Sequence, residues 1–214
     1  MRVAVVTGAT GALGSAVARA LGGNGFEVHR FGSRAAHAEG ESSRLHAVDL
    51  LDLDATRQLA REFGAVDALA LCAGGFSMAA LGALNHDDID GMIDVNFKTA
   101  VHALAAFTPK LSHGAAVVLV GSQSYEGAAR MAPYAASKAA VVSLAKSAAA
   151  ELKTAGVQVN AVLPDTMDTP ANRRAIPDAD FSRWAKVEEV AAVIAWLCSP
   201  AARVVSGNTI RVGR

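Results

Sequence analysis

Cysteine is scarce in this chain of 214 residues, which has only Cys72 and Cys198. Two thiols so far apart argue against a disulfide framework or a metal site. Both lie in apolar runs, and we expect them to be buried free thiols. Aromatic residues make up only 5% of the chain, whereas alanine and glycine are abundant. This composition suits helices that pack closely on a sheet.

An excess of charge of either sign is also missing, because 20 basic and 20 acidic residues give a formal net charge of zero. Nucleic acids and membrane surfaces attract concentrated basic charge, so neither partner is expected. The first residues show no signal-peptide pattern. The apolar stretch 65–84 is interrupted by Asp67 and by the pair Gly74–Gly75, which argues against a transmembrane span. We therefore expect a cytoplasmic protein that acts on a small molecule. The histidines show no metal-ligand spacing and are expected to face solvent.

Short apolar runs alternate with helix-length segments along the chain. Several runs are continuous rather than alternating, as in strands buried on both faces. The pattern predicts one α/β domain over residues 1–214, with a doubly wound parallel sheet and helices on both faces. Strands are expected at Val3–Val6, Glu27–Phe31, Leu45–Val48, Ala68–Leu71, Ala116–Val120, Gln158–Leu163 and Thr209–Val212. Helices are expected near residues 12–23, 52–63, 86–110, 131–154 and 187–198.

The segment 164–186 is irregular, with three prolines and clustered charges. It follows a late strand, where the open end of a parallel sheet meets a ligand. We interpret residues 165–186 as a substrate-side loop; the alternative is a plain surface connection.

The first strand runs into a glycine-rich turn, Thr7-Gly8-Ala9-Thr10-Gly11-Ala12-Leu13-Gly14. Gly8 allows a tight turn, Gly11 lets the backbone approach a pyrophosphate, and Gly14 permits close packing of helix on strand. The helix that follows would direct free N–H groups and its dipole at the phosphates. Strand, glycine turn and amphipathic helix together predict a dinucleotide site.

The end of the second strand bears on the choice of dinucleotide. An acidic residue there normally binds the ribose of NAD, but this strand runs into Gly32, Ser33 and Arg34. Arg34, helped by Ser33, is placed to meet a 2′-phosphate, so NADP (NADPH) is favoured over NAD. The alternative is a solvated surface arginine. Asp49 is expected either to accept from the adenine amino group or to cap the next segment.

Tyr134 and Lys138 are four residues apart in a predicted helix, which places them on one face. A phenol titrates near pH ~10 and is a poor proton donor at neutral pH. A neighbouring ammonium favours the phenolate and lowers its pKa. The pair is therefore a candidate general acid.

With the glycine turn and this pair, the chain resembles the short-chain dehydrogenase/reductase family. Further matches are Cys72-Ala73-Gly74, Val95-Asn96 and the segment 159–164, although Cys72 stands where the family has an asparagine that braces the central strands. The segment 161–184 is most similar to the substrate loop of dihydropteridine reductases. The resemblance implies a seven-stranded Rossmann domain and an NAD(P)-dependent oxidoreductase.

The resemblance also implies catalytic roles for Asn96, Ser122, Tyr134 and Lys138. Asn96 would kink its helix and hold a water in a relay to Lys138, which would bind the ribose hydroxyls. Ser122 would hydrogen-bond the substrate oxygen, with Ser124 as the alternative hydroxyl. No metal ligand is expected. The cofactor-binding residues implied are Gly8, Thr10, Gly11, Ala12, Leu13, Gly14, Ser33, Arg34, Asp49, Leu50, Ala73, Gly74, Gly75, Tyr134, Lys138, Pro164, Thr166 and Thr169.

The function expected is reduction of a C=O or C=N group in a small cyclic or aromatic substrate, with a quinonoid pterin as the first candidate. The polarity of the substrate site would be set by Gly75, Phe76, Ser77 and the loop 165–186. A general carbonyl or 3-oxoacyl reductase is the alternative, which Ser122 favours. A non-catalytic dinucleotide sensor would not need the spacing of Tyr134 and Lys138.

A homodimer or homotetramer is expected from the helix that begins near Met131. Small residues lie on more than one of its faces: Ala135, Ala139, Ser143 and Ser147. They would allow two helices to approach closely across a two-fold axis, and the family commonly associates there. An inert alanine-rich surface is the alternative.

Overall fold

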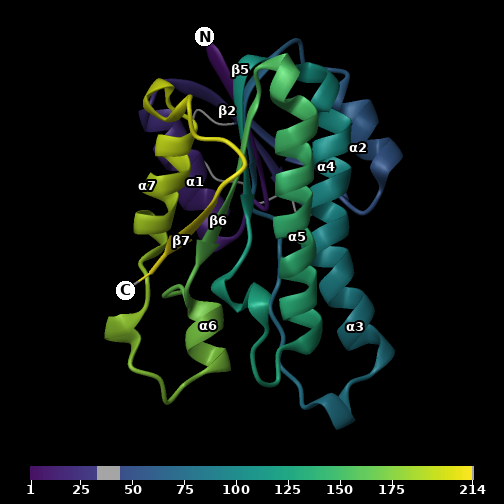
Figure 1. Ribbon diagram of the computed structural model, residues 1–214, viewed down its shortest axis with the longest axis vertical. Helices are drawn as coiled ribbons and strands as arrows, with labels where there is room; N and C mark the ends of the chain where they lie inside the picture. Colours follow the sequence, from purple (N-terminus) through teal and green to yellow (C-terminus); the bar gives the residue numbers. More distant parts are fainter. Residues whose placement is uncertain (33–43, 214) are drawn as a thin grey trace.

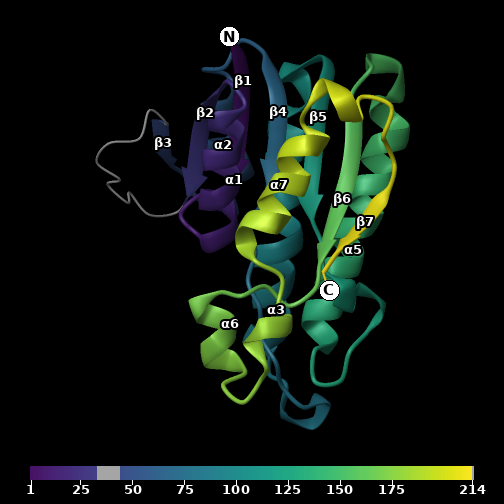
Figure 2. The ribbon, with the colours of Figure 1, turned by 90° about the vertical axis from the view of Figure 1, so that its left-hand side faces the viewer.

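The seven expected strands form one parallel sheet in the computed structural model, which describes residues 1–32 and 44–213. The strand order is β3-β2-β1-β4-β5-β6-β7 (Figure 2). The strands are β1 (Arg2–Thr7), β2 (Phe26–Gly32), β3 (Arg44–Ala47), β4 (Val66–Leu71), β5 (Leu111–Val120), β6 (Gln158–Pro164) and β7 (Thr209–Val212). The predicted fold class is confirmed.

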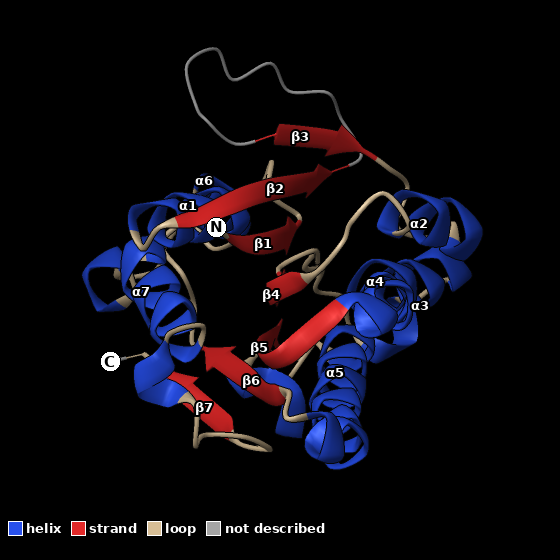
Figure 3. Cartoon of the chain, turned by 90° about the horizontal axis from the view of Figure 1, so that it is seen from above, coloured by secondary structure: helices blue, strands red, loops and turns tan. Residues whose placement is uncertain are grey.

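Helices cover both faces of the sheet. Figure 3 shows α1 and α7 on one face and α2, α4 and α5 on the other. Two further helices, α3 and α6, lie beyond the carboxyl ends of the strands, at the bottom of Figure 1. The helices are α1 (Ala12–Gly23), α2 (Leu53–Ala60), α3 (His86–Met92), α4 (Thr99–Phe107), α5 (Ala132–Glu151), α6 (Pro170–Ala175) and α7 (Val187–Leu197).

Each face of the sheet carries its own hydrophobic core, because successive strand residues point to opposite sides. On β1, Ala4 and Val6 belong to the core under α1 and α7, whereas Val5 belongs to the core under α2, α4 and α5. Phe31 and Phe107 are fully buried in the second core, with ring centroids 5.5 Å apart at 85°. The continuous apolar runs of the sequence therefore fill two cores at once.

The strand order reverses between β1 and β4. From β1 the chain builds outward to β2 and β3, and then crosses back to place β4 on the other side of β1. The connections leaving β1 and β4 therefore diverge and open a crevice at the carboxyl ends of these strands. The glycine turn after β1 and the segment after β4 both lie at this crevice.

Two segments differ from the expectation. The helix expected over 52–63 is shorter, because α2 ends at Ala60 and Phe63 turns into the core. The irregular segment 164–186 contains α6, which begins with Pro170 after Thr169; the Thr169 hydroxyl caps the helix by accepting from Asn172 N. The cap of α6 is a local contact, whereas the end of α2 depends on the tertiary contact that buries Phe63.

The expectation that the histidines face solvent is wrong for His29. Its side chain is buried, with Nδ1 2.9 Å from Nε2 of His46. The two rings stack between β2 and β3, against Phe63. Alternation along β2 places His29 on the same side as the buried Phe31, which explains its burial.

In the part of the chain that the structure describes, no helix combines the length and the apolar character needed to cross a membrane.

Candidate active site

The glycine turn is held against β4 so tightly that side chains are excluded. Gly8 has a φ of +62°, and a Cβ there would lie 2.6 Å from the backbone nitrogen of Ala73. A Cβ on Gly14 would overlap the carbonyl oxygen of Gly8. The lack of space for a Cβ at Gly8 and Gly14 agrees with the tight turn and the close helix packing predicted for them.

The N-terminus of α1 is left open by the same turn. Its N-cap, Gly11, has no side chain with which to accept a hydrogen bond, so the first-turn N–H groups of α1 have no side-chain cap. Uncapped N–H groups and a helix dipole form a ready anion site. The turn thus fits the phosphates of a dinucleotide.

A cavity of about 980 Å³ runs from this turn along the carboxyl ends of β1, β4, β5 and β6. Ser33 and Arg34 lie outside the described residues, so the structure says nothing of their predicted contact with a 2′-phosphate. All the other predicted cofactor residues line the cavity: Gly8, Thr10, Gly11, Ala12, Leu13, Gly14, Asp49, Leu50, Ala73, Gly74, Gly75, Tyr134, Lys138, Pro164, Thr166 and Thr169.

The cavity is crowded beside Gly32, at the end of β2, where the sequence lacks the acid expected for NAD. A Cβ on Gly32 would lie 2.9 Å from Cγ2 of Thr10, so a larger residue would displace that side chain. Asp49 lines the cavity, and its Oδ1 accepts from Leu51 N at 2.9 Å. Asp49 therefore caps the turn that follows it, which is the alternative role expected for it, whereas the N-cap of α2 itself is Asp52.

Tyr134 and Lys138 both lie on α5 and face the cavity, as predicted. The Lys138 side chain is buried, and its Nζ donates to the carbonyl of Val120 at 3.0 Å and lies 5.9 Å from the centroid of the Tyr134 ring. Burial lowers the pKa of Lys138 to about 8, because desolvation penalises the ammonium.

The prediction that Lys138 lowers the pKa of Tyr134 is wrong for this structure. Burial raises the pKa of the phenol above its ordinary value, and a hydrogen bond with Ser122 opposes that rise. Lys138 does not overcome this rise in the protein without a ligand, where its ammonium is directed at the carbonyl of Val120. Tyr134 is therefore a neutral phenol in this structure, and Ser122 is the hydrogen-bonding group that opposes the rise of its pKa.

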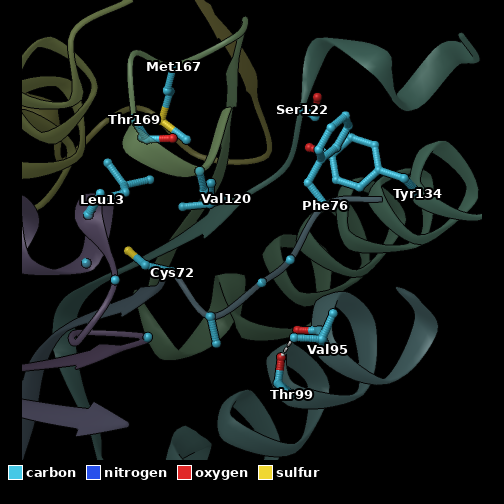
Figure 4. A pocket seen from close by; sticks show the side chains of 18 of the residues that line it. Leu13, Cys72, Phe76, Val95, Thr99, Val120, Ser122, Tyr134, Met167 and Thr169 are labelled. Atoms are coloured by element: carbon cyan, nitrogen blue, oxygen red, sulfur yellow. Dashed lines mark hydrogen bonds between the residues drawn. The ribbon is translucent and has the colours of Figure 1, made fainter. Parts of the chain in front are cut away.

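Ser122, rather than Ser124, is the hydroxyl that meets the tyrosine. Ser122 is buried at the end of β5, and its Oγ accepts from Ser124 N at 3.2 Å. Figure 4 shows Ser122 and Tyr134 pointing toward one another beside Phe76. The Phe76 ring meets the Tyr134 ring edge to face, with centroids 5.0 Å apart. The contact fixes the tyrosine ring and closes one wall of the cavity.

Asn96 lies behind the cavity wall, where the regular helix is interrupted. Residues Ile93–Lys98 form a π-helical segment between α3 and α4, so the predicted distortion is confirmed. The Asn96 amide is buried; Oδ1 accepts from Gly75 N and Nδ2 donates to Gly75 O, both at 3.1 Å. The side chain therefore clamps the loop that follows β4. The water relay to Lys138 stays a prediction.

The backbone at Gly74 packs closely against the side chains of Asn96 and Lys138. A Cβ on Gly74 would lie 2.7 Å from Asn96 Oδ1 and 3.3 Å from Lys138 Nζ, so only glycine fits between them. On the next helical turn the Thr99 hydroxyl donates to the carbonyl of Val95 at 2.7 Å, the dashed line in Figure 4.

Cys72 lines the cavity and is only half-buried, whereas Cys198 is buried, so the expectation of two buried thiols holds for Cys198 alone. The surroundings of Cys72 raise its pKa to about 12 through desolvation, which leaves an unreactive thiol. The brace that the family's asparagine supplies is made here in part by Thr7, whose Oγ1 accepts from Ala73 N at 3.2 Å.

The end of the cavity beyond Tyr134 includes residues that the sequence did not single out. Ser77, expected to set the polarity of this end, is not among the described lining residues. Nothing in the sequence separates Arg174 from the other arginines of the loop, and Met131 carries no motif. Met131 lies outside the predicted site, whereas Met167, Asn172, Arg174 and Ile176 belong to the loop 165–186, which was predicted as a whole to lie on the substrate side.

Comparison with known proteins gives a consistent result. The family model described as short chain dehydrogenase matches residues 2–180. The chain is 32% identical to the cyclic-di-GMP-binding biofilm dispersal mediator protein of Escherichia coli K12, over 96% of this chain and 93% of that protein. It is 29% identical to a 3-oxoacyl-acyl-carrier-protein reductase of Staphylococcus aureus strain Mu50, over 98% and 95% of the two chains.

Among solved structures, a blue fluorescent protein from a metagenomic library, in complex with NADPH, superposes with a TM-score of 0.88 at 27% identity. The match covers 99% of this chain and 96% of that one. None of the relatives named here supports the narrower resemblance to dihydropteridine reductase.

Proposed function

The chain belongs to the short-chain dehydrogenase family, and from that premise we propose that it reduces a C=O group, or the related C=N group, of a small substrate. The observation that carries the proposal is one continuous cavity. It joins the open N-terminus of α1 to Tyr134, Ser122 and Lys138. A site for phosphates and a proton donor thus lie in the same crevice.

A nicotinamide dinucleotide in this cavity would supply the hydride. Tyr134, kept protonated by burial, donates its proton to the substrate oxygen as negative charge develops there. Ser122 donates a hydrogen bond to the same oxygen and stabilises that charge. The ammonium of Lys138 lies beside Gly74, where it binds ribose hydroxyls and favours the phenolate that forms. Asn96 acts through Gly75 by fixing the wall of the cavity.

NADPH is the proposed form of the cofactor. Gly32 stands at the position of the acidic residue that binds the ribose of NAD, and Thr10 fills the space beside it. Arg34 is the residue proposed to bind the 2′-phosphate. Dissociation constants for NADPH and NADH, measured from the quenching of Trp fluorescence, test this directly. NADPH binding at least tenfold tighter supports the role of Arg34, whereas equal or tighter NADH binding contradicts it.

Ketones and 3-oxoacyl thioesters are the substrates that the site supports best, which makes a general carbonyl or 3-oxoacyl reductase the first candidate. Ser122 is in contact with Tyr134, and a relative of nearly full coverage is a 3-oxoacyl-acyl-carrier-protein reductase. A quinonoid dihydropterin remains the second candidate, because the segment 161–184 resembles dihydropteridine reductases. The loop 165–186 is proposed to determine which of them binds.

A substrate panel distinguishes these candidates. Oxidation of NADPH is followed by the loss of its absorbance at about 340 nm. The substrates offered are 3-oxoacyl thioesters, aryl ketones and a quinonoid dihydropterin. Turnover of the ketones or thioesters above that of the pterin supports the first class. Turnover of the pterin alone supports the second.

A binding role without chemistry is the competing function, since one relative is named as a cyclic-di-GMP-binding protein. Such a protein would bind NADPH or a cyclic dinucleotide and turn over no member of the panel. A titration with cyclic-di-GMP beside the panel therefore separates a sensor from a reductase.

A further inference from the structure

Two adjacent arginines on α6 have different surroundings. Arg173 donates from Nε and Nη2 to the carboxylate of Asp168, at 2.6 and 2.8 Å, and its guanidinium lies 4.7 Å from the centroid of the Phe181 ring. Arg174 lines the cavity instead. Among the residues that the structure describes, no carboxylate forms an ion pair with Arg174.

The short helix that carries Arg174 is held in place on several sides. The Thr169 hydroxyl accepts from Asn172 N at 3.1 Å, and Asn172 Nδ2 donates to the carbonyl of Met167 at 2.8 Å. Asp168 N donates to Ala185 O at 2.9 Å, which ties the start of the segment to its end. These hydrogen bonds therefore fix the position of α6, the helix that carries Arg174.

The acidic side chains around the cavity are already engaged. Asp94 lies 2.6 Å from the ammonium of Lys98, and Asp165 accepts from Thr166 N at 2.7 Å. Asp49 accepts from the backbone near the adenosine end. The other cation that lines the described cavity, Lys138, is directed at Val120 O. Arg174 thus lines the cavity without a carboxylate partner among the described residues.

Part of the cavity lining is apolar. Phe76 packs on the tyrosine ring, and Met131, Met167 and Ile176 also line the cavity. Figure 4 shows Met167 directed into the cavity across from Phe76. Apolar lining residues together with the Arg174 guanidinium match a ligand that has an apolar body and one anionic end.

We propose that Arg174 determines substrate specificity by binding a carboxylate or phosphate of the substrate whose carbonyl group reaches Ser122 and Tyr134. The planar guanidinium suits either anion, because its N–H groups form paired hydrogen bonds with two oxygens. The inference rests on the proposed function and names its substrate class, a keto acid or a phosphorylated ketone. A cofactor phosphate offers the same chemistry, so the test separates the two sources.

The experiment compares aryl keto acids of increasing chain length, each with its uncharged methyl ester. The ratio of kcat/KM for acid over ester is measured for the wild type, for Arg174→Gln, and for Arg174→Lys, which keeps the charge. Arg183→Gln is the matched control, since Arg183 is exposed on the same loop and does not line the cavity. Calorimetric titration of the NADPH-loaded protein with benzoate gives a readout without turnover.

The wild type is expected to prefer at least one acid over its ester. Arg174→Gln should lower that preference about ten- to a hundredfold, the range for a hydrogen bond to a charged group. It should also abolish benzoate binding and leave the dissociation constant for NADPH unchanged. Arg174→Lys should retain part of the preference, and Arg183→Gln all of it.

Three results would overturn the inference. Weaker NADPH binding by Arg174→Gln with an unchanged ratio would assign the anion to the cofactor. Equal turnover of acids and esters by the wild type would remove the anionic substrate and leave the reductase intact. If the wild type turned over neither acid nor ester, nor any member of the substrate panel, the proposed function itself would fail.

Discussion

At the scale of single residues, the site combines a buried phenol with a buried amine whose pKa values move in opposite directions. Burial disfavours the charged form of each group, so it raises the pKa of Tyr134 and lowers that of Lys138. Tyr134 is thus a weaker acid than its spacing from Lys138 indicates. A proton donor of this kind depends on Ser122 and on the positive charge that Lys138 keeps below its pKa of about 8.

Cofactor affinity is expected to fall as the pH rises through about 8. The pKa of Lys138 is lowered to about 8, so the free protein loses this proton above that pH. An anionic ligand favours the ammonium, so binding takes up a proton above this pKa. Affinity should then fall by at most about tenfold per pH unit. Fluorescence titration with NADPH across this range measures the slope.

The matched pair for that slope is Lys138→Met and Lys146→Met, because Lys146 lies on the exposed side of the same helix. The first variant should bind more weakly below the pKa and show no fall above it. The second should behave as the wild type. An undiminished slope in Lys138→Met would assign the titration to another group.

Much of the site at this scale is readable from the sequence. Gly8, Gly14, Tyr134 and Lys138 are identified by spacing, and spacing is a local property. The cavity position of Arg174 depends instead on how α6 folds back over the strand ends. The direction of the Lys138 ammonium depends equally on the carbonyl of Val120, which lies on another element.

At the scale of elements, the π-helical segment Ile93–Lys98 and the pair β2–β3 show how packing changes what a pattern predicts. The asparagine signal was local, since Asn is a poor former of regular helix. Its partner, the backbone of Gly75, lies on a different element and could not be read from the sequence. The same holds for His29 and His46, which meet only when β2 and β3 pair.

Acid should loosen the edge of the sheet that contains these histidines. Burial lowers the pKa of both below 6.5, with Glu27 and Glu62 opposing the shift and Arg44 adding to it. Unfolded chains therefore bind more protons than the native state between the lowered values and 6.5, so stability falls as the pH drops through that window. Urea midpoints at about pH 7.5 and about pH 5 measure the loss.

His46→Gln should reduce this loss, because it removes one of the two histidines whose pKa is lowered. His86→Gln is the control, since His86 is exposed at the start of α3. If His46→Gln loses as much stability in acid as the wild type, the histidine pair is not the source.

At the scale of the whole molecule, all seven strands were predicted, each with at least part of its observed range. Strands buried on both faces give continuous apolar runs, and these are the clearest signal in the chain. The short α6 could not be predicted as readily, because its six residues carry little periodicity.

We expect the protein to associate through α5. Ser143 and Ser147 are exposed there, as the prediction requires, but Ala135 is buried and was wrongly placed on an outer face. Light scattering after size exclusion should give at least twice the mass of one chain. Ser143→Arg should shift it to one chain, since a long cation prevents close helix approach, while Asn24→Arg, at the exposed C-cap of α1, should not. A wild-type monomer would contradict this.

Turnover by Tyr134→Phe is the most direct test of the account. This variant removes one oxygen from the cavity and leaves the glycine turn intact. With NADPH and any ketone that the wild type reduces, kcat should fall about 100- to 10 000-fold while the dissociation constant for NADPH stays the same. Tyr125→Phe, at the other tyrosine of the chain, should keep full activity. Unchanged turnover by Tyr134→Phe would contradict the account.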